Sequence, residues 1–369
     1  MANNRQRIFG LDLMRATAIM MVLFAHTLWI FPESNGFFYQ ILKLFGFLGV
    51  EIFFVLSGFL IGKILYQLYL KDNFSLTAVF FFLKRRWFRT VPSYFLVLLL
   101  NIIIASIIGY SVPELWRYFL FLQNFKATML PFFPESWSLS VEEYAYVILP
   151  FFLLLLSFIT KPKNKPRFFL LAVSFLILLF FSTKMFYQNT TLNTTIDQWN
   201  VSLKSVVLYR LDSIFIGVFC SWIYSSRYFF WIKNKLFFVC FGTLIFGFLF
   251  AGIGYFGLFI ETNAAFWNVI YLPLVSVAVA CFLPFLSEWK EEKSLINKPI
   301  AFISIISYSI YLLHYSVILQ LMKYYASTAI TTYFGLYTFA FLYILITVLV
   351  SSIFYRFYEK PMTDIRDKN

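Results

Sequence analysis

Charged side chains and both histidines lie inside long apolar stretches of this 369-residue chain. In hydrocarbon a single charge costs roughly 2.5–3.5 kcal/mol, so such residues persist where a partner or an aqueous cavity compensates them. A helix bundle that uses such polar residues only to hold its helices together would need few of them. The number of these residues in the chain therefore favours a polar cavity. They are Asp12, Arg15, His26, Glu51, Lys63, Glu142, Glu143, Arg210, Asp212 and His314.

The first apolar stretch carries a cation and an imidazole on one helical face. Arg15 and His26 are eleven residues apart, which in a helix is about 20° more than three turns and a rise of about 16 Å. Asp12, one turn before Arg15, is placed to pair with it. Histidine suits acid or base catalysis near neutral pH, although a lone histidine can also simply bond a neighbouring helix. The stripe indicates a channel for an elongated anionic molecule.

A basic cluster, Lys84–Arg89, precedes Pro92 and the third apolar stretch. Such a cluster at a cytoplasmic helix end is commonly a topology signal alone. Arg86 and Arg89, however, are three residues apart and would form a compact fork for phosphate groups. A donor of the coenzyme A type has phosphates at one end and a thioester at the other. The sequence therefore predicts a basic cytoplasmic mouth that leads to His26.

Two glutamates follow a serine-rich segment within Trp137–Tyr146. In the simplest interpretation a serine caps the next helix, and Glu142 and Glu143 lie in its first turn near the positive end of the helix dipole. In the functional alternative, Glu142 is a carboxylate at the outer mouth that orients His26 or binds a sugar hydroxyl. The flanking tryptophan and tyrosines also fit an interfacial aromatic belt.

The composition identifies the environment of the apolar stretches. The chain is 61% hydrophobic and 13% charged, whereas soluble domains carry about 25% charged residues. We expect an all-α, polytopic transmembrane helical bundle that forms one membrane-embedded domain over residues 1–369, with no appended soluble domain. At about 20 residues per crossing the chain has about ten spans, at 9–31, 46–70, 91–110, 141–159, 168–187, 205–225, 236–260, 267–287, 300–322 and 334–356.

The net charge of +13 could indicate nucleic-acid binding, but the basic residues occupy short loops on alternate sides of the spans. One set of loops holds 21 of the 30 Lys and Arg residues. By the positive-inside rule both termini are cytoplasmic. We expect a multi-pass protein of the cytoplasmic (inner) membrane, with membrane lipid and no nucleic acid as partners. The opposite loops hold Lys43, Arg117, Lys126, Lys184, Lys204 and Lys323.

The longest outward loop covers about residues 111–140. It contains Pro113, Pro131, Pro134 and a run of aromatic residues. We expect it to dip back toward the membrane as a partly helical cap.

Seven segments along the chain stand in a specific order and spacing. Each segment alone would be weak evidence for a family. Together they resemble the acyltransferase-3 family, the integral membrane O-acyltransferases that modify O-antigen and other surface glycans. The segments are Gly10–Ala18 with His26, Gly49–Ile61, Arg86–Arg89 with Pro92 and Tyr94, Trp137–Glu142, Tyr209–Asp212 with Gly217, Ser307–His314, and Glu359–Pro361.

The resemblance implies a ten-span core with acetyl-CoA as the usual donor. It places the family's central pair on Arg15 and His26, its second basic motif on Arg86 and Arg89, and its glutamate on Glu142. His26 and Glu142 are then the expected catalytic residues, and the three arginines the expected donor-binding residues. Supporting roles are expected for Asp12, Ser57, Arg210, Asp212, Tyr308, His314 and Glu359.

The chain departs from the family pattern at three places. Met14 stands where glycine is common, Leu313 replaces a frequent tryptophan, and no proline follows the second histidine in Tyr315–Val317. These departures leave the assignment of His26 intact and leave the role of His314 open.

The expected function is a membrane O-acetyltransferase that moves an acetyl group from cytoplasmic acetyl-CoA to a hydroxyl of an envelope glycan such as O-antigen, capsule or exopolysaccharide. His26 would act as general base or as acyl carrier, and Lys84 or Arg85 could help to hold the donor phosphates. No metal is expected, because two distant histidines and scattered carboxylates give no ligand spacing. The alternatives are an ion-coupled transporter, for which no paired broken helices are evident, and a structural or regulatory membrane protein.

Overall fold

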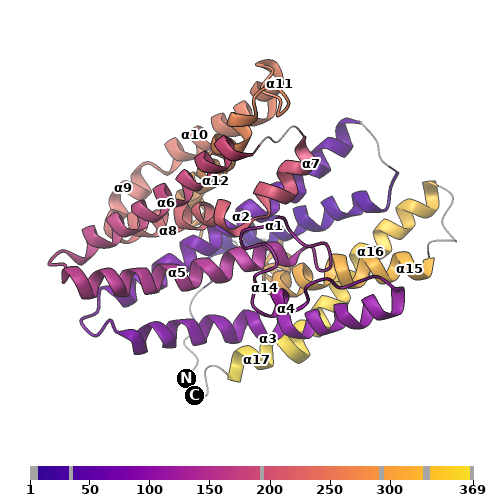
Figure 1. Ribbon diagram of the computed structural model, residues 1–369, viewed down its shortest axis with the longest axis horizontal. Coiled ribbons are helices and arrows are strands. Elements are labelled where there is room, and N and C mark those ends of the chain that lie inside the picture. Colours follow the sequence, from indigo (N-terminus) through magenta and orange to yellow (C-terminus); the bar gives the residue numbers. More distant parts are fainter. Residues whose placement is uncertain (1–6, 33–35, 192–194, 291–294, 327–332, 366–369) are drawn as a thin grey trace.

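The protein, seen in a computed structural model, is described over residues 7–32, 36–191, 195–290, 295–326 and 333–365, and these ranges contain helices and no strand. Helices α3 and α5 run along the long axis of the molecule, and α6, α8, α10 and α12 form a group inclined to them (Figure 1). Short η elements, which are 3₁₀ or π turns, extend or interrupt several helices. In chain order the elements are α1 (Phe9–His26), η1 (Thr27–Trp29), α2 (Phe37–Tyr69), α3 (Leu76–Ile108), α4 (Trp116–Phe119), α5 (Ser136–Thr160), α6 (Lys165–Thr190), α7 (Ile196–Trp199), η2 (Asn200–Lys204), η3 (Val207–Tyr209), α8 (Leu211–Ser226), α9 (Tyr228–Lys233), α10 (Lys235–Gly247), η4 (Phe248–Gly252), α11 (Ile253–Tyr255), η5 (Phe266–Tyr271), α12 (Leu272–Ala280), α13 (Leu283–Leu286), α14 (Asn297–Leu313), η6 (His314–Leu319), α15 (Gln320–Ala326), α16 (Tyr333–Phe354), η7 (Tyr355–Glu359) and α17 (Lys360–Ile365).

Nine helical segments in the described ranges are long and apolar enough to cross a membrane, and the tenth expected span is the shorter helix α8. The all-α polytopic bundle is therefore confirmed, while the cytoplasmic position of the termini stays a prediction. The span expected at 205–225 is shortened because residues 207–209 form a 3₁₀ turn and α8 begins only at Leu211. With 16 residues, α8 is about 24 Å long and does not cover a hydrocarbon core of about 30 Å.

Helix α3 changes the position of the basic cluster. It contains 33 residues, Leu76–Ile108, and is therefore about 50 Å long. The expectation that Lys84–Arg89 belongs to a loop is wrong, because no helix breaker separates Leu76 from Pro92 and the helix continues through this proline. As a result, Arg86 and Arg89 occupy fixed positions one turn apart on a helix.

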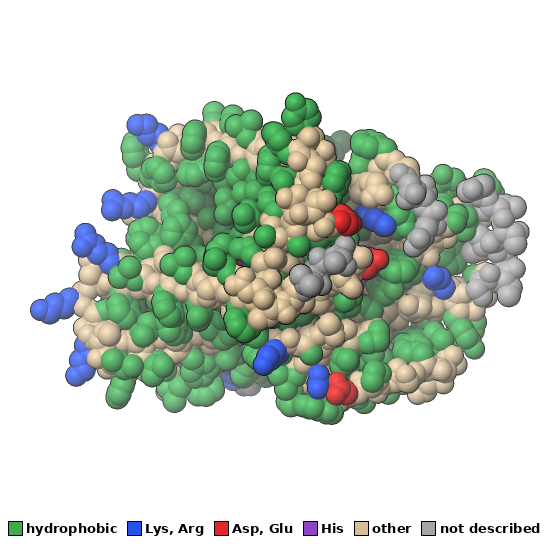
Figure 2. All heavy atoms as spheres, turned by 45° about the horizontal axis from the view of Figure 1, so that its top comes forward, with side chains coloured by type: hydrophobic (Ala, Val, Ile, Leu, Met, Phe, Trp, Pro, Cys, Tyr) green, Lys and Arg blue, Asp and Glu red, His purple; other side chains and the backbone are tan. Residues whose placement is uncertain are grey.

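The surface of the molecule is apolar between its ends. Green hydrophobic side chains cover most of the face in Figure 2, and Lys and Arg side chains gather at one end of it. Phe158 in α5 and Phe186 in α6 are 82% and 69% exposed. A continuous apolar surface that covers most of one face is rare on soluble monomers and marks a surface that contacts lipid or protein. The fold is that of a multi-pass membrane protein.

Two lysines assigned to outward loops by the sequence belong to the folded interior. Lys184 lies in α6 and is fully buried. Lys204 ends the π turn η2 and is half-buried. When these two lysines are left out, one set of loops still holds many more Lys and Arg residues than the other.

The crossing of α2 and α8 is a close backbone contact. Gly58 lies against the carbonyl of Ile214, and Gly217 lies against the carbonyl of Val55, so neither position has room for a Cβ. Small residues allow membrane helices to approach closely and gain van der Waals contact where no hydrophobic force acts between them. Helix α2 also packs along α1 and α12, so it is the central helix of the bundle.

Two buried ion pairs join α8 and the residue before it to neighbouring helices. Arg210 pairs with Glu51 of α2, and Asp212 pairs with Lys184 of α6 at 2.5 Å. Ser276 of α12 donates a hydrogen bond to Glu51 at 3.0 Å. Breaking a buried pair by removing one partner is strongly destabilising, at about 3–5 kcal/mol. Arg210 and Asp212 therefore act as packing residues here.

The loop between α3 and α5 is partly helical, as expected. It contains α4, and its buried residues Gln123 and Asn124 bond to the start of α5. Gln123 donates to Ser140 Oγ at 2.7 Å, and Asn124 donates to the carbonyls of Trp137 at 3.0 Å and Ser205 at 2.6 Å. The loop thus ties the first turns of α5 to the segment that follows η2.

Gly217→Ala should destabilise the protein by about 1–3 kcal/mol, because the added methyl group would collide with the backbone of α2 at Val55. The matched control is Gly247→Ala in α10, where an added Cβ has no heavy atom within 4 Å. This control should be neutral or slightly stabilising. Thermal unfolding of the detergent-solubilised variants measures both effects. Equal melting temperatures for Gly217→Ala and the wild type would contradict the close α2–α8 contact.

Candidate active site

A pocket of about 820 Å³, open mouth included, lies between α1, α2, α3, α5 and α14. Much of its wall is apolar, with side chains such as Phe53, Phe54 and Leu139. Five helices that are far apart in the sequence also bring polar residues into it. The site residues expected from the sequence that line it are Arg15, Ser57, Arg86, Arg89, Glu142 and Tyr308.

Three arginines give the pocket its charge. Arg86 and Arg89 come from one face of α3, and Arg15 comes from α1. All three side chains line the same pocket, so their positive charges add. Among the described residues that line the pocket, Glu142 is the single acidic one, so this lining carries an excess of positive charge. An apolar-walled cleft with charge of one sign attracts and concentrates anions of the opposite sign.

Lys84 and Arg85, which precede Arg86 and Arg89 on α3, do not line the pocket. The Lys84 ammonium lies 5.9 Å from the ring centroid of Phe88, and the Arg85 guanidinium lies 5.9 Å from that of Phe81. Arg85 is exposed. The helix therefore separates one pair of basic residues in the pocket from another pair outside it.

Glu142 ends a chain of hydrogen bonds on the pocket wall. The Tyr146 hydroxyl donates to Glu142 Oε2 at 2.7 Å. Ser57 Oγ lies 2.5 Å from the same phenol oxygen, so the serine O–H donates to it. The carboxylate is thereby held in position beside the arginine cluster, which is where a donor or a leaving group could contact it.

The capping interpretation of the segment before Glu142 is wrong. Helix α5 begins at Ser136, earlier than expected, and no side-chain hydrogen bond caps it. The Ser136 hydroxyl bonds instead to the Phe133 carbonyl. Glu142 and Glu143 therefore lie beyond the first turn of the helix.

Asp12 is bound mainly by a residue that precedes α1. Arg7 donates to both carboxylate oxygens, at 2.7 and 2.8 Å, and Ser304 Oγ donates at 2.8 Å. The expected pair with Arg15 is present at 3.8 Å. Because Arg7 neutralises most of the charge of Asp12, Arg15 keeps its charge available to the pocket.

His26 and His314 form a pair at the far end of α1. The fully buried ring of His314 lies nearly perpendicular to the half-buried ring of His26, with centroids 4.6 Å apart and His26 Nδ1 3.3 Å from His314 Nε2. The Tyr315 ring lies 5.0 Å from that of His26. His314 opens the π turn η6, and π turns inside helices frequently mark functional sites. Helix spacing alone could not predict this contact.

Backbone carbonyls set the tautomers of both rings. His26 Nδ1 lies 2.8 Å from the Val22 carbonyl oxygen, and His314 Nδ1 lies 2.7 Å from that of Tyr311. A carbonyl only accepts, so each neutral ring carries its proton on Nδ1. His314 Nε2 can then accept from His26 Nδ1, and His26 Nε2 keeps a lone pair that no described residue occupies. His26 Nε2 is therefore available as a base or nucleophile.

The expectation that Glu142 orients His26 does not match this geometry. The His26 ring is fixed by the hydrogen bonds that its Nδ1–H donates to the Val22 carbonyl and to His314 Nε2, and no contact joins Glu142 to His26 in the described part of the chain. Glu142 belongs to the arginine pocket. The two residues expected to be catalytic therefore occupy different parts of the site.

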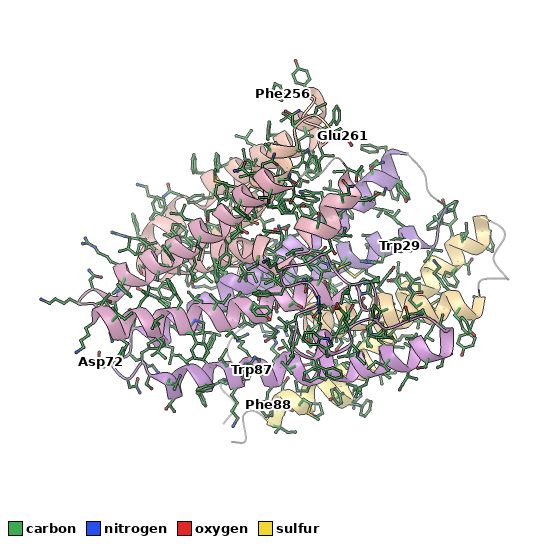
Figure 3. The ribbon with its side chains drawn as sticks, viewed as in Figure 1. Trp29, Asp72, Trp87, Phe88, Phe256 and Glu261 are labelled. Atoms are coloured by element: carbon green, nitrogen blue, oxygen red, sulfur yellow. The ribbon has the colours of Figure 1, made fainter. Side chains whose placement is uncertain are left out.

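The pocket and the histidine pair lie in sequence along the bundle. Trp29, in the turn that follows His26, lies at the opposite end of the molecule from Asp72, in the connection between α2 and α3 (Figure 3). Tyr311, which lines the pocket, is one helical turn from His314, with ring centroids 5.8 Å apart. Its hydroxyl contacts Ser138 Oγ at 2.6 Å and donates to the Glu135 carbonyl at 3.1 Å. Tyr311 therefore stands between the pocket and the two histidines.

Glu135 is a site residue that the apolar pattern does not reveal, because it lies in the loop before α5. Its Oε1 accepts hydrogen bonds from the backbone N–H of Ser316 at 3.0 Å and from its hydroxyl at 2.6 Å, while Oε2 has no partner in the described ranges. Burial raises the pKa of Glu135 to about 7, although the bonds from Ser316 oppose this. Glu135 holds the π turn that carries His314. Its position just before the Trp137–Glu142 motif is the available sequence signal.

The remaining expected site residues lie around the pocket. Tyr308 donates to the Thr90 carbonyl at 2.8 Å, and Thr90 donates to Glu143 at 2.8 Å. Glu359 accepts a hydrogen bond from Ser309 and does not line the pocket. Within the described ranges, no three His, Cys, Asp or Glu side chains gather as ligands for a metal ion.

Comparisons with known proteins agree with this arrangement. A family model described as an acyltransferase domain, the acyltransferase-3 model, matches residues 8–356. A Staphylococcus aureus (strain COL) protein named "Putative O-acetyltransferase" is 26% identical over 378 residues, which cover 95% of this chain and 56% of the relative. The O-acetyltransferase OatA of Staphylococcus aureus (strain NCTC 8325 / PS 47) is 26% identical over 395 residues, covering 96% and 57%. The chain thus spans just over half the length of these relatives. No solved structure gives a significant match.

A pH dependence of stability follows from Glu135. Because burial raises its pKa from 4.5 to about 7, the folded protein binds this proton more tightly than the unfolded chain. Stability should fall as pH rises from about 4.5 to about 7, by up to about 3 kcal/mol. Glu135→Gln keeps an acceptor oxygen for Ser316 and cannot ionise, so its melting temperature should lack this fall and should match or exceed that of the wild type at pH 8. The same fall in both proteins would exclude Glu135 as its source.

Proposed function

Because the chain belongs to the acyltransferase-3 family, we propose that it is a membrane O-acetyltransferase that moves an acetyl group from cytoplasmic acetyl-CoA to a hydroxyl of a cell-envelope glycan. The proposal rests on one observation above all. A pocket with three arginines and a histidine with a free Nε2 lie along the same helix, α1, separated by Tyr311. The names of the related proteins, O-acetyltransferases, support the same activity.

The donor fits the arginine pocket by its charge and shape. Acetyl-CoA carries phosphates at one end and the thioester at the other. Arg86, Arg89 and Arg15 would hold the phosphates, with the guanidinium groups as bidentate donors. The apolar wall of the pocket continues toward Tyr311, and the thioester arm would follow it. Displacement of the Tyr311 hydroxyl from Ser138 would then give the thioester access to the histidine pair.

The chemistry assigns a defined role to each nitrogen of His26. Its Nε2 removes the proton of the acceptor hydroxyl as that oxygen attacks the thioester carbonyl. The new C–O bond forms, the C–S bond breaks, and the imidazolium returns the proton to the thiolate, which leaves as coenzyme A. During this step His314 Nε2 and the Val22 carbonyl accept from His26 Nδ1–H, which stabilises the imidazolium and keeps the ring aligned. In the carrier route the same Nε2 holds the acetyl group between donor and acceptor.

The compartments follow from the two ends of the bundle. The arginine pocket faces the basic end of the molecule, and the positive-inside rule makes this the cytoplasmic end. The histidine pair then lies toward the outer face of the cytoplasmic membrane, where O-antigen, capsule or exopolysaccharide chains carry free hydroxyls.

Purified protein that consumes acetyl-CoA with such a glycan and without an ion gradient would support the enzyme, and strict dependence on a gradient would support a transporter. Mass spectrometry of the surface polysaccharide with and without the gene would identify the acetylated sugar.

His26→Ala should abolish acetyl transfer, and His26→Gln should lower kcat by at least about 100-fold, because both remove the free Nε2. Donor binding and membrane insertion should stay unchanged, since the arginine pocket is intact. Transfer is measured with radiolabelled acetyl-CoA and insertion by protease accessibility in membranes. Full activity in either variant would contradict the mechanism. An acetylated His26 peptide, after incubation with acetyl-CoA alone, would select the carrier route.

Arg86→Ala and Arg89→Ala should each raise the KM for acetyl-CoA about 10-fold or more, because each removes a charged hydrogen bond worth about 1.5–3 kcal/mol. Arg85→Ala is the matched control, since it removes the same charge from an exposed position of the same helix. Its KM should stay within about twofold of the wild type. Donor titrations at fixed acceptor concentration measure all three. A similar increase for Arg85→Ala would reduce the role of this cluster to general surface charge.

A further inference from the structure

Lys204 lies at the histidine end of the bundle, and the donor chemistry does not use it. It ends the π turn η2 and is half-buried. Its Nζ lies 5.8 Å from the ring centroid of Trp137 and 5.9 Å from that of Phe47. No hydrogen bond or ion pair joins it to any residue of the described ranges. An ammonium group withdrawn from water and faced only by rings lacks the anion that such sites normally contain.

Lys204 is held firmly by the fold. Asn124 donates to the carbonyl of Ser205, the next residue, at 2.6 Å, and to the carbonyl of Trp137 at 3.0 Å. The Val207 N–H donates to the Asn124 carbonyl at 3.0 Å. These bonds fix the backbone at the end of η2 against the first turn of α5, which places Lys204 beside Trp137.

The lysine is a neighbour of the proposed base and not of the donor phosphates. Lys204 Nζ lies 5.9 Å from the ring centroid of Phe47, and the residue before Phe47, Gly46, packs against Ala25, which precedes His26. The arginine pocket includes Arg15, which lies about 16 Å from His26 along α1, and Lys204 does not line that pocket. Its charge is therefore available for a second ligand that meets the thioester at His26.

An aromatic wall extends from the lysine. The Phe47 ring stacks on that of Tyr271 with centroids 5.5 Å apart, and Tyr271 stacks on Trp267 at 4.3 Å. Phe47 and Trp267 are partly exposed. Flat aromatic faces beside a fixed polar group are surfaces on which sugar rings can pack through their C–H faces, as in apolar ligand sites with a few placed polar groups.

We propose that Lys204 is an acceptor-binding residue that selects anionic glycans, by pairing with a carboxylate or phosphate of the sugar whose hydroxyl is presented to His26. This inference rests on the proposed function and narrows its substrate class from glycans in general to acidic ones. The ion pair would form in a partly desolvated site, where it is stronger than at an open surface. The Trp137 and Phe47 rings would exclude water from it.

The first experiment compares matched acceptors with the protein in nanodiscs of zwitterionic phosphatidylcholine, which leaves out anionic lipid as a competitor. The acceptors are trigalacturonate and its fully methyl-esterified form, in which each carboxylate is replaced by an uncharged methyl ester. Lys204→Met should raise the KM for trigalacturonate at least 10-fold and leave the KM values for the ester and for acetyl-CoA unchanged. Lys204→Arg should restore most of the binding. Lys126→Met, an exposed lysine of the preceding loop, is the control and should behave as wild type.

Two results of this comparison would overturn the proposal. One is an equal loss with both acceptors, which would make Lys204 a general catalytic or structural residue. The other is an unchanged KM for trigalacturonate in Lys204→Met. Acceptor-independent loss of acetyl-CoA binding would likewise place the lysine in the donor site.

The second experiment needs no turnover. Burial lowers the pKa of Lys204 from 10.5 to about 8, so at pH 8 it should react with a water-soluble amine-acylating reagent faster than Lys126, as measured by peptide mass spectrometry. Trigalacturonate or galactose 1-phosphate should slow this reaction at least fivefold, and the methyl ester should not. Protection of Lys204 by trigalacturonate alone would identify a carboxylate as the bound group, and protection by galactose 1-phosphate alone would identify a phosphate. Protection by neither compound would overturn the anion site.

The two proposals can fail separately. Protection of Lys204 without any acetyl transfer would contradict only the acetyltransferase function, and acetyl transfer without protection of Lys204 would contradict only the role of this lysine.

Discussion

The contact between α2 and α8 is the constraint on which the rest of the protein depends. In a bilayer the hydrophobic effect does not drive helices together, so their packing must come from close backbone approach and from polar groups that cannot be left unpaired. Gly58 and Gly217 provide the approach, and the pair of Arg210 with Glu51 provides the polar bond. Both act on α2. Its position determines where Ser57 and the apolar wall of the pocket stand relative to α1 and α5.

The site is divided into two polar regions, because the polar side chains of each region form their hydrogen bonds and ion pairs with residues of the same region. At one end, Arg7 neutralises Asp12, and the three arginines that line the pocket outnumber the acidic residue Glu142. At the other end, backbone carbonyls hold both histidines with the free nitrogen on His26. Tyr311 lies between these regions. The separation suits a reaction in which a polyanionic donor and a hydroxyl acceptor approach from opposite sides of a membrane and meet at one imidazole.

Several features of the fold were predictable from local sequence, and others were not. The apolar stretches predicted the nine described helices that are long enough to span a bilayer, because a bilayer requires length and apolarity that few other structures show. The tenth expected span is the shorter helix α8. The position of Lys84–Arg89 was predicted wrongly, because charge suggested a loop where helix propensity extended α3. Lys184 was placed outside for the same reason, although Asp212 neutralises it in the interior. A charge and its partner on another helix cannot be matched from one sequence without the fold.

The sequence by itself determined the environment, the apolar helices and the residue types that carry chemistry, since these depend on composition and on spacing within single helices. It placed Arg15 and His26 on one face of α1 and Arg86 and Arg89 on one face of α3. Only the tertiary structure decided that His314 meets His26, that Glu142 lines the pocket with the arginines, that Glu135 bonds to Ser316, and that Lys204 faces Trp137. These are contacts between elements separated by up to about 290 residues. They depend on helix rotation and depth, which packing sets and no local pattern encodes.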